Sequence, residues 1–194
     1  MNWKDQKALA LSIDPELDVS GDYDDIMKRI DLDRFLRILD DERVPEDVRS
    51  GWAYYWARKI GDKEIMIDRV LESEWAYCWA RGLGDREIMI DRVLESKWAY
   101  WWARWIGDRE IMRDRVIESE WAYWWALHFG DRELMRERVI EGAWAYEWAK
   151  DIGDREVMID RVVESEWAYR WALNISDKEI MEQRFPEESK KWVY

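Results

Sequence analysis

Tryptophans at a fixed spacing constrain the fold of this chain more than any other feature of its sequence. Six tryptophans recur every 23 residues: Trp52, Trp75, Trp98, Trp121, Trp144 and Trp167. Six more follow at the same period, four residues later: Trp56, Trp79, Trp102, Trp125, Trp148 and Trp171. The six copies share the pattern W-A-Y-x-W-A-x-x-I-G-D-K/R-E-I-M-x-D-R-V-x-E-S-x, whose positions we number 1 to 23 from the first Trp. Such a period is the signature of a repeat architecture.

Each copy is predicted to form two short helices. Ser or Gly at position 22 is expected to cap the first helix, which carries Trp at positions 1 and 5, Ala at 2 and 6 and an apolar residue at 9 on one stripe. Gly at position 10, replaced by Ser176 in the last copy, suits a left-handed helix end, and the Asp at position 11 is expected to cap the second helix. The second helix is predicted to bury positions 14, 15 and 19, such as Ile65, Met66 and Val70.

One copy cannot fold alone, because two buried tryptophans contribute on the order of 10 kcal/mol whereas ordering one copy costs on the order of 35 kcal/mol. Stacked copies bury both faces of each helical hairpin, so most of the tryptophans, ten or more of the 17, are expected in the core. We predict an all-α fold, an α-solenoid of six helix-turn-helix repeats. Residues 1–51 form a helical N-terminal cap with a degenerate half-repeat, residues 52–189 the six repeats and residues 190–194 a C-terminal tail.

The composition fits a helical, non-membrane protein. Gly and Pro number nine and three, too few for the turns of an all-β fold, and no apolar run approaches the roughly 20 residues that cross a bilayer. The N-terminus is acidic where a signal peptide is basic, and the single Cys78 forms no intrachain disulfide, so we expect a cytoplasmic protein. A net charge of −13 disfavours direct binding to nucleic acid or anionic membranes and leaves basic partners open.

The signature Trp-Ala-Tyr-x-Trp-Ala resembles the short tandem repeats found in uncharacterised bacteriophage and bacterial proteins. The resemblance covers residues 52–185 and is specific for the repeat type, but it implies little about activity. It implies a cytoplasmic phage or host-interaction protein. A designed repeat protein is an alternative origin for so regular a sequence, although the irregular N-terminal segment argues against an idealised design.

The sequence offers little for catalysis. One His, His128, and one Cys cannot form a His/Cys metal cluster, and Ser119 lies at a helix end with no orienting acid implied for a His128–Ser pair. The recurring Gly-Asp turns lack the spacing of a phosphate-binding loop. The Arg at position 18, which recurs with Glu at 13 and 21, is expected to form an ion-pair ladder. We therefore predict no catalytic residues, no metal, no cofactor and no enzyme activity.

The positions at which the copies differ carry the functional prediction. The pair of residues at positions 4 and 8 is different in every copy, and position 16 varies as well. Copies three and four place aromatic residues and arginines at these positions, a composition typical of interaction hot spots. The predicted binding surface comprises Tyr55, Trp101, Trp105, Arg113, Trp124, His128, Arg136, Glu147, Asp151 and Arg170. The alternative is that the additional tryptophans pack under the N-terminal segment or against a second subunit.

Three functions remain open at this point. The favoured one is a non-enzymatic binding scaffold that engages another protein, or a second copy of itself, with inhibition of a host enzyme or defence system as a specific form. The second is an acidic nucleic-acid mimic that docks through residues 14–33 and repeat 5, the most acidic copy. The third is capture of a small molecule or nucleotide in an aromatic pocket, for example on Trp101 or Trp124.

Overall fold

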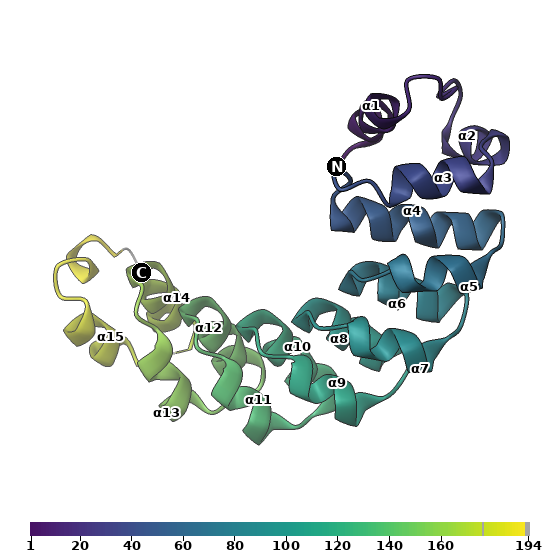
Figure 1. The fold of residues 1–194 in the computed structure, drawn as a ribbon. Coiled ribbons are helices and arrows are strands. Elements are labelled where there is room, and N and C mark those ends of the chain that lie inside the picture. The colour runs from purple at the N-terminus through teal and green to yellow at the C-terminus, as the bar shows by residue number, and fades with distance from the viewer. Residues whose placement is uncertain (176, 193–194) are drawn as a thin grey trace. The chain divides into compact units, whose positions relative to one another are not determined.

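The computed structural model describes residues 1–175 and 177–192, and within them the chain is all-helical. The helices pack in neighbouring pairs along the chain, which confirms the predicted α-solenoid (Figure 1). Contacts divide the chain into two compact units, Met1–Arg109 and Glu110–Tyr194. The N-terminal segment contributes three helices: α1 (Trp3–Ile13), α2 (Tyr23–Arg29) and α3 (Leu32–Leu39).

Each copy forms a longer first helix and a shorter second helix. The first helices are α4 (Glu46–Lys59), α6 (Ser73–Gly82), α8 (Ser96–Trp105), α10 (Ser119–Phe129), α12 (Gly142–Asp151) and α14 (Ser165–Asn174). The second helices are α5 (Lys63–Met66), α7 (Arg86–Met89), α9 (Arg109–Arg115), α11 (Arg132–Arg138), α13 (Arg155–Met158) and α15 (Lys178–Arg184). Three of these continue into a 3₁₀ turn: η1 (Ile67–Arg69), η2 (Ile90–Arg92) and η3 (Ile159–Arg161); a further 3₁₀ turn, η4 (Ser189–Lys191), follows α15.

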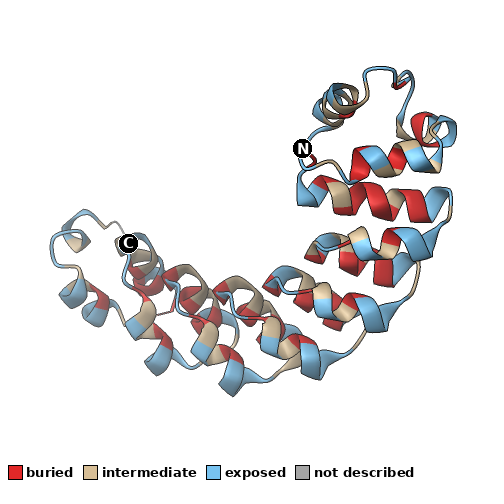
Figure 2. Cartoon of the chain, in the orientation of Figure 1, coloured by how far each residue is buried: buried red, intermediate tan, exposed pale blue. Residues whose placement is uncertain are grey.

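First helices of neighbouring copies contact each other within each unit. In the first unit α4 contacts α6 and α6 contacts α8, and in the second unit α10 contacts α12 and α12 contacts α14. Figure 2 shows the buried residues on the faces where the helices of successive copies meet, with exposed residues on the outer turns. The hydrophobic core is therefore a series of layers between copies, as expected for a solenoid.

The tryptophan at position 5 is the centre of every layer. Its side chain is fully or almost fully buried in all six copies: Trp56, Trp79, Trp102, Trp125, Trp148 and Trp171. In each copy its indole Nε1–H donates to Oδ2 of the Asp at position 11, at 2.9 Å for Trp79–Asp85 and 3.0 Å for Trp125–Asp131. The carboxylate thereby satisfies a donor that burial would otherwise leave without a partner.

This pairing corrects the predicted role of the Asp at position 11. Asp131 directly precedes α11, but its side chain makes no capping hydrogen bond. Its backbone has φ 53°, and the Asp at this position is left-handed in all six copies. Gly at position 10 also has positive φ, for example 92° at Gly130, but with ψ −130° Gly130 does not adopt the predicted left-handed helical conformation; Ser176 lies outside the described residues. Two successive positive-φ residues reverse the chain between the helices, and Asp tolerates this region better than most side chains.

The prediction that Ser at position 22 caps the first helix is also wrong. The residue before it, a Glu, is the N-cap residue and makes no side-chain capping bond, and the Ser is the first helical residue. The buried Ser119 Oγ instead donates to the carbonyl oxygen of Arg138 and accepts from the backbone N–H of Ile140 at 3.0 Å and of Glu141 at 3.3 Å. Ser50 and Ser73 make the same three bonds. Each serine therefore joins its copy to the next one.

Copy four lacks this link at its end, because Gly142 occupies position 22. A Cβ built on Gly142 would meet the Glu164 carboxylate, the far end of a flexible and exposed side chain, and would lie 3.4 Å from the carbonyl oxygen of Arg161. We predict that Gly142→Ser raises the free energy of unfolding by about 0.5–1.5 kcal/mol, through helix propensity and the restored hydrogen bonds. Urea unfolding followed by circular dichroism measures this change. Gly142→Ala separates the helix-propensity contribution, and a gain no larger for Ser than for Ala would contradict the proposed link.

Arg at position 18 binds the preceding copy rather than a Glu of its own copy. Arg138 donates to the carbonyl oxygens of Arg113 and Val116, and Arg161 donates to those of Arg136 and Val139. Arg92 makes both equivalent bonds, and Arg184 donates to the carbonyl oxygens of Ile159 and Asp160. The expected ion-pair ladder within each copy is therefore replaced by charge-assisted bonds to backbone oxygens at the end of the preceding second helix, with an acid of the preceding copy close by.

The core is smaller than the sequence predicts in two respects. Seven of the 17 tryptophans are buried, because the position-1 tryptophan is buried only in copy one, at Trp52, and is half-buried elsewhere. At position 14 Ile65 is 38% exposed, whereas Met66 and Val70 at positions 15 and 19 are fully buried as predicted. The buried Tyr at position 3, such as Tyr123, takes part in the core in place of the position-1 tryptophan.

The N-terminal segment has an apolar core of its own and covers copy one. Phe35 of α3 stacks on Trp56 with ring centroids 4.2 Å apart, and Trp52 donates its indole N–H to Gln6 Oε1 at 2.8 Å. Ser50 makes the same bonds as the position-22 serines of the repeats. Within the described residues, no helix is both long enough and apolar enough to span a membrane.

Candidate binding groove

Positions 1, 4 and 8 of the first helix lie on one face, because residues three and four apart are neighbours on a helix surface. Since the first helices of adjacent copies lie side by side, these faces combine into a continuous surface within each unit. The Trp at position 1 stands against the buried Tyr at position 3 of the preceding copy, as in Tyr123–Trp144 at 5.5 Å between ring centroids. The variable positions 4 and 8 lie beside this aromatic ladder.

In the second unit this surface is hollowed into a groove of about 500 Å³, which we call the α10–α14 groove. It is lined by Tyr123, Trp124, Ala143, Trp144, Glu147, Asp151 and Trp167. Three of the predicted binding residues, Trp124, Glu147 and Asp151, therefore meet in one site. The volume lies within the range of about 300–1,000 Å³ that is typical of ligand pockets.

The carboxylates of this groove lie within a hydrogen-bonded and ion-paired cluster. Tyr123 donates its hydroxyl to Asp151 Oδ2 at 2.6 Å, and Lys150 Nζ pairs with Glu147 and lies 3.8 Å from Asp151 Oδ1. Burial of Tyr123, followed by its bond to Asp151, raises the pKa of the phenol. The pairing with Glu147 raises the pKa of Lys150 above its usual value. The groove thus holds two carboxyl groups against aromatic walls.

The raised pKa of Tyr123 predicts a loss of stability in alkaline solution. Below pH 10, the usual pKa of a tyrosine, the phenol is protonated in both the folded and the unfolded chain. Above it the unfolded chain releases the proton first, so the free energy of unfolding decreases as pH rises. We expect Tyr123→Phe to show a shallower decrease than the natural chain between about pH 10 and 11.5. Parallel urea titrations at each pH measure this; equal slopes would contradict the role of Tyr123.

Copy one has a corresponding groove in the first unit, lined in part by Tyr55, Lys59 and Trp75, and the N-terminal helices lie against it. Tyr55 contacts Tyr23 of α2 with ring centroids 5.2 Å apart, and Lys59 Nζ pairs with Asp24 of α2 at 2.7 Å. The predicted binding residue Tyr55 therefore packs under the N-terminal segment, a position that the alternative interpretation gave to the additional tryptophans and not to Tyr55.

The two additional tryptophans of copy three are not core residues. Trp101 is half-buried against Tyr100, with ring centroids 5.3 Å apart, and Trp105 is 56% exposed. The guanidinium groups of Arg81 and Arg104 lie 5.5 and 5.8 Å from the centre of the Trp105 ring. Trp105 is therefore an exposed tryptophan partly covered by two arginines.

The remaining predicted residues do not line the α10–α14 groove. His128 stacks on Trp124 at 5.7 Å, and its Nδ1 lies 2.9 Å from the carbonyl oxygen of Trp124. Arg170 lies over the Trp167 ring at 4.7 Å. Arg113 and Arg136, in α9 and α11, are near Asp114 and Glu137 respectively and do not line the groove.

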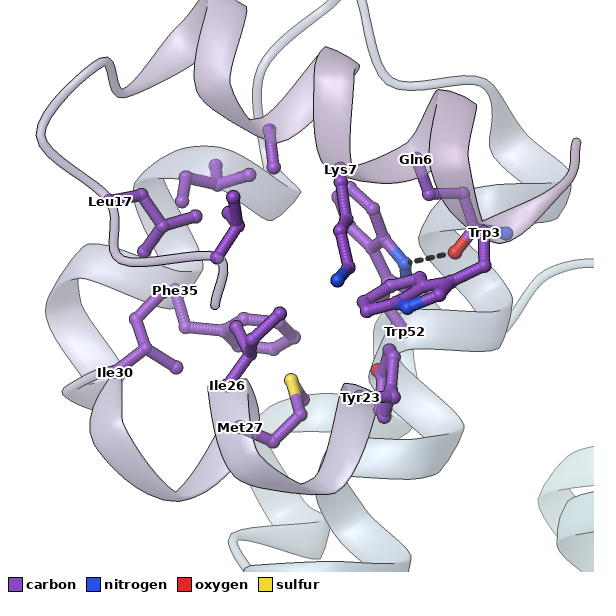
Figure 3. Close-up of a pocket in the computed structure, with 13 residues that line it drawn as sticks. Trp3, Gln6, Lys7, Leu17, Tyr23, Ile26, Met27, Ile30, Phe35 and Trp52 are labelled. Atoms are coloured by element: carbon purple, nitrogen blue, oxygen red, sulfur yellow. Dashed lines mark hydrogen bonds between the residues drawn. The ribbon is translucent and has the colours of Figure 1, made fainter. Parts of the chain in front are cut away.

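A small apolar cavity of about 40 Å³ lies within the N-terminal segment, lined by residues that include Trp3, Phe35 and Trp52 (Figure 3). It is too small for a nucleotide, which needs a pocket several times larger. Tyr23 reaches its wall with a buried hydroxyl that has no hydrogen-bond partner among the described residues, and burial raises the pKa of this phenol. Among all the residues that the structure describes, no group of three or more His, Cys, Asp or Glu is arranged to hold a metal ion.

Two walls of the groove were not among the predicted binding residues. Trp144 and Trp167 line it, although the position-1 tryptophans were expected in the core. Helical spacing could have indicated this, because position 1 is three and seven residues from positions 4 and 8 and so shares their face.

Comparisons with known proteins found no match: the chain matches no known protein family, no curated protein and no solved structure.

Proposed function

We propose that this protein is a non-enzymatic α-solenoid scaffold that binds another protein through its variable aromatic surface, centred on the α10–α14 groove. One observation carries the proposal: packing residues repeat in every copy, while positions 4 and 8, beside the aromatic ladder, change from copy to copy. A surface that served only packing would need the same residues in each layer. The resemblance to phage repeat sequences adds the expectation of a cytoplasmic host partner, such as a host enzyme or defence protein.

The other candidate functions have less support. Acids in residues 14–33 make contacts within the chain: Asp18 pairs with Arg29 at 2.7 Å, Asp24 pairs with Lys59, and the Asp31 side chain caps α3. These contacts reduce the charge available for mimicry of a nucleic-acid backbone. For catalysis, the recurring Asp residues serve the fold through their bonds to buried tryptophans.

Affinity capture from lysate of the host tests the proposal. We compare the natural chain with Trp124→Glu plus Glu147→Lys, which changes the groove, and with Leu134→Glu plus Glu133→Lys, which makes the same charge changes on the exposed face of α11. We expect all three proteins to keep the same circular dichroism and only the groove variant to lose its main partner. Capture that is unchanged in the groove variant, or lost equally in both variants, would contradict the proposed surface.

A further inference from the structure

Copy one shows how positions 4 and 8 hold a docked segment. Tyr23 and Asp24 are consecutive residues of α2, and they meet Tyr55 at position 4 and Lys59 at position 8. Trp75, the position-1 tryptophan of the next copy, also contacts Tyr55, at 5.5 Å between ring centroids. A helix of this chain is therefore held by aromatic contact together with one ion pair of complementary charge.

Copy five carries the opposite charge at these positions. Glu147 and Asp151 replace the Tyr55 and Lys59 of copy one, and the copy has seven acidic and three basic residues, a net charge of −4. Trp124, Trp144 and Trp167 line the same groove. Aromatic faces attract organic cations, and carboxylates form strong charge-assisted bonds with Lys and Arg. By the complementarity seen in copy one, the segment that docks here carries a positive charge.

Cations already lie on this tryptophan ladder, both at a wall of the α10–α14 groove and in the first unit. The Arg170 guanidinium is 4.7 Å from the Trp167 ring and pairs with Glu166 at 3.1 Å. Lys97 Nζ lies 4.8 Å from the ring of Trp98, in the first unit. A position-1 tryptophan with a neighbouring carboxylate is thus an arrangement that accommodates a guanidinium group in this very fold.

We propose that the α10–α14 groove binds a lysine or arginine side chain from a basic segment of a partner protein. The aromatic walls contact the alkyl part and the cation, and Glu147 and Asp151 pair with the charge. Lys150, which pairs with Glu147, has a 42% exposed side chain and turns to solvent when the incoming cation takes its place. This inference rests on the proposed function and names the chemistry of the partner.

Indole NMR of the full chain labelled with ¹⁵N tests the inference with small probes. N-acetyl-arginine amide and N-acetyl-lysine amide are titrated against N-acetyl-citrulline amide, the uncharged counterpart of the arginine probe. We expect the cationic probes to shift the indole resonances of Trp124, Trp144 and Trp167, and to bind at least about 10-fold more tightly than citrulline. Single Trp→Phe variants assign these resonances. Equal shifts with citrulline, or no shifts with any probe, would overturn the inference.

A matched pair of variants separates the groove from general charge attraction. Glu147→Gln plus Asp151→Asn removes two charges from the groove, and Glu133→Gln plus Glu156→Gln removes two from exposed positions of α11 and α13. Binding of the arginine probe is expected to weaken by about 10-fold in the first pair and to stay within about twofold in the second. Equal weakening in both pairs would overturn the inference. If neither cationic probe binds while capture from lysate still depends on the groove, the proposed scaffold function is supported. Only the inference that the partner inserts a lysine or arginine side chain is then wrong.

Discussion

Replacement of Trp125 by Ala is expected to lower the free energy of unfolding by about 3–5 kcal/mol, the cost of removing a fully buried Trp. Trp125 has no exposed surface, whereas Trp144 at position 1 is half-buried and lines the groove. Trp144→Ala is expected to cost about 1–2 kcal/mol, because only part of its area is removed from solvent. The two tryptophan ladders look equivalent in the sequence, but only the position-5 ladder is fully enclosed.

Urea unfolding of both variants, followed by circular dichroism, measures the difference. Trp125→Phe is the control for ring volume: it keeps an aromatic side chain in the layer and loses the indole N–H, and it is expected to cost about 1–2 kcal/mol. Equal costs for Trp125→Ala and Trp144→Ala would contradict the assignment of the two ladders to core and surface.

The second large effect is expected at Asp131, which combines a left-handed backbone with the bond to Trp125. Asp131→Ala removes the acceptor and places a Cβ at φ 53° without a compensating side-chain bond, so we expect a loss of about 2–3 kcal/mol. Asp131→Asn keeps an acceptor and tolerates this backbone, so we expect a loss below about 1 kcal/mol. Asp131→Gly removes the strain of a side chain at positive φ but also loses the bond from Trp125, so we expect a loss of about 1–2 kcal/mol.

Urea unfolding followed by circular dichroism compares these three substitutions. The test is the order of their losses in the free energy of unfolding: largest for Ala, intermediate for Gly and smallest for Asn. If Gly costs as much as Ala, the left-handed backbone contributes nothing to the preference for Asp at this position. If Gly costs nothing, the bond from the Trp125 indole is unimportant and the repeated Asp needs another explanation.

The sequence predicts the fold class well because its information is periodic. A 23-residue period with two helical stretches leaves little alternative to stacked hairpins, and burial of Met66 and Val70 follows from apolar spacing alone. The predicted caps are wrong because capping was inferred from residue type within one copy. Ser119 and Asp131 instead bind partners that only the folded hairpin or the next copy provides.

The candidate site was predictable in part. Variation at positions 4 and 8 identifies Trp124, Glu147 and Asp151, which the structure places in one groove. It does not distinguish them from Tyr55, whose variation reflects docking of the N-terminal helix α2. Whether a variable position is covered depends on contacts between distant parts of the chain, and one repeat pattern cannot reveal those contacts.

The central claim is that the copies stack in register, so that stability lies in contacts between neighbouring copies. It is tested most directly by deleting a whole period, residues 121–143, from copy four, and in parallel a partial period, residues 121–138. The whole-period deletion joins Glu120 to Trp144 and restores the order of the repeat. Helicity per residue, measured by circular dichroism, is expected to stay at the natural value in the whole-period deletion and to fall in the partial one. Equal loss of helicity in both proteins would contradict stacking in register.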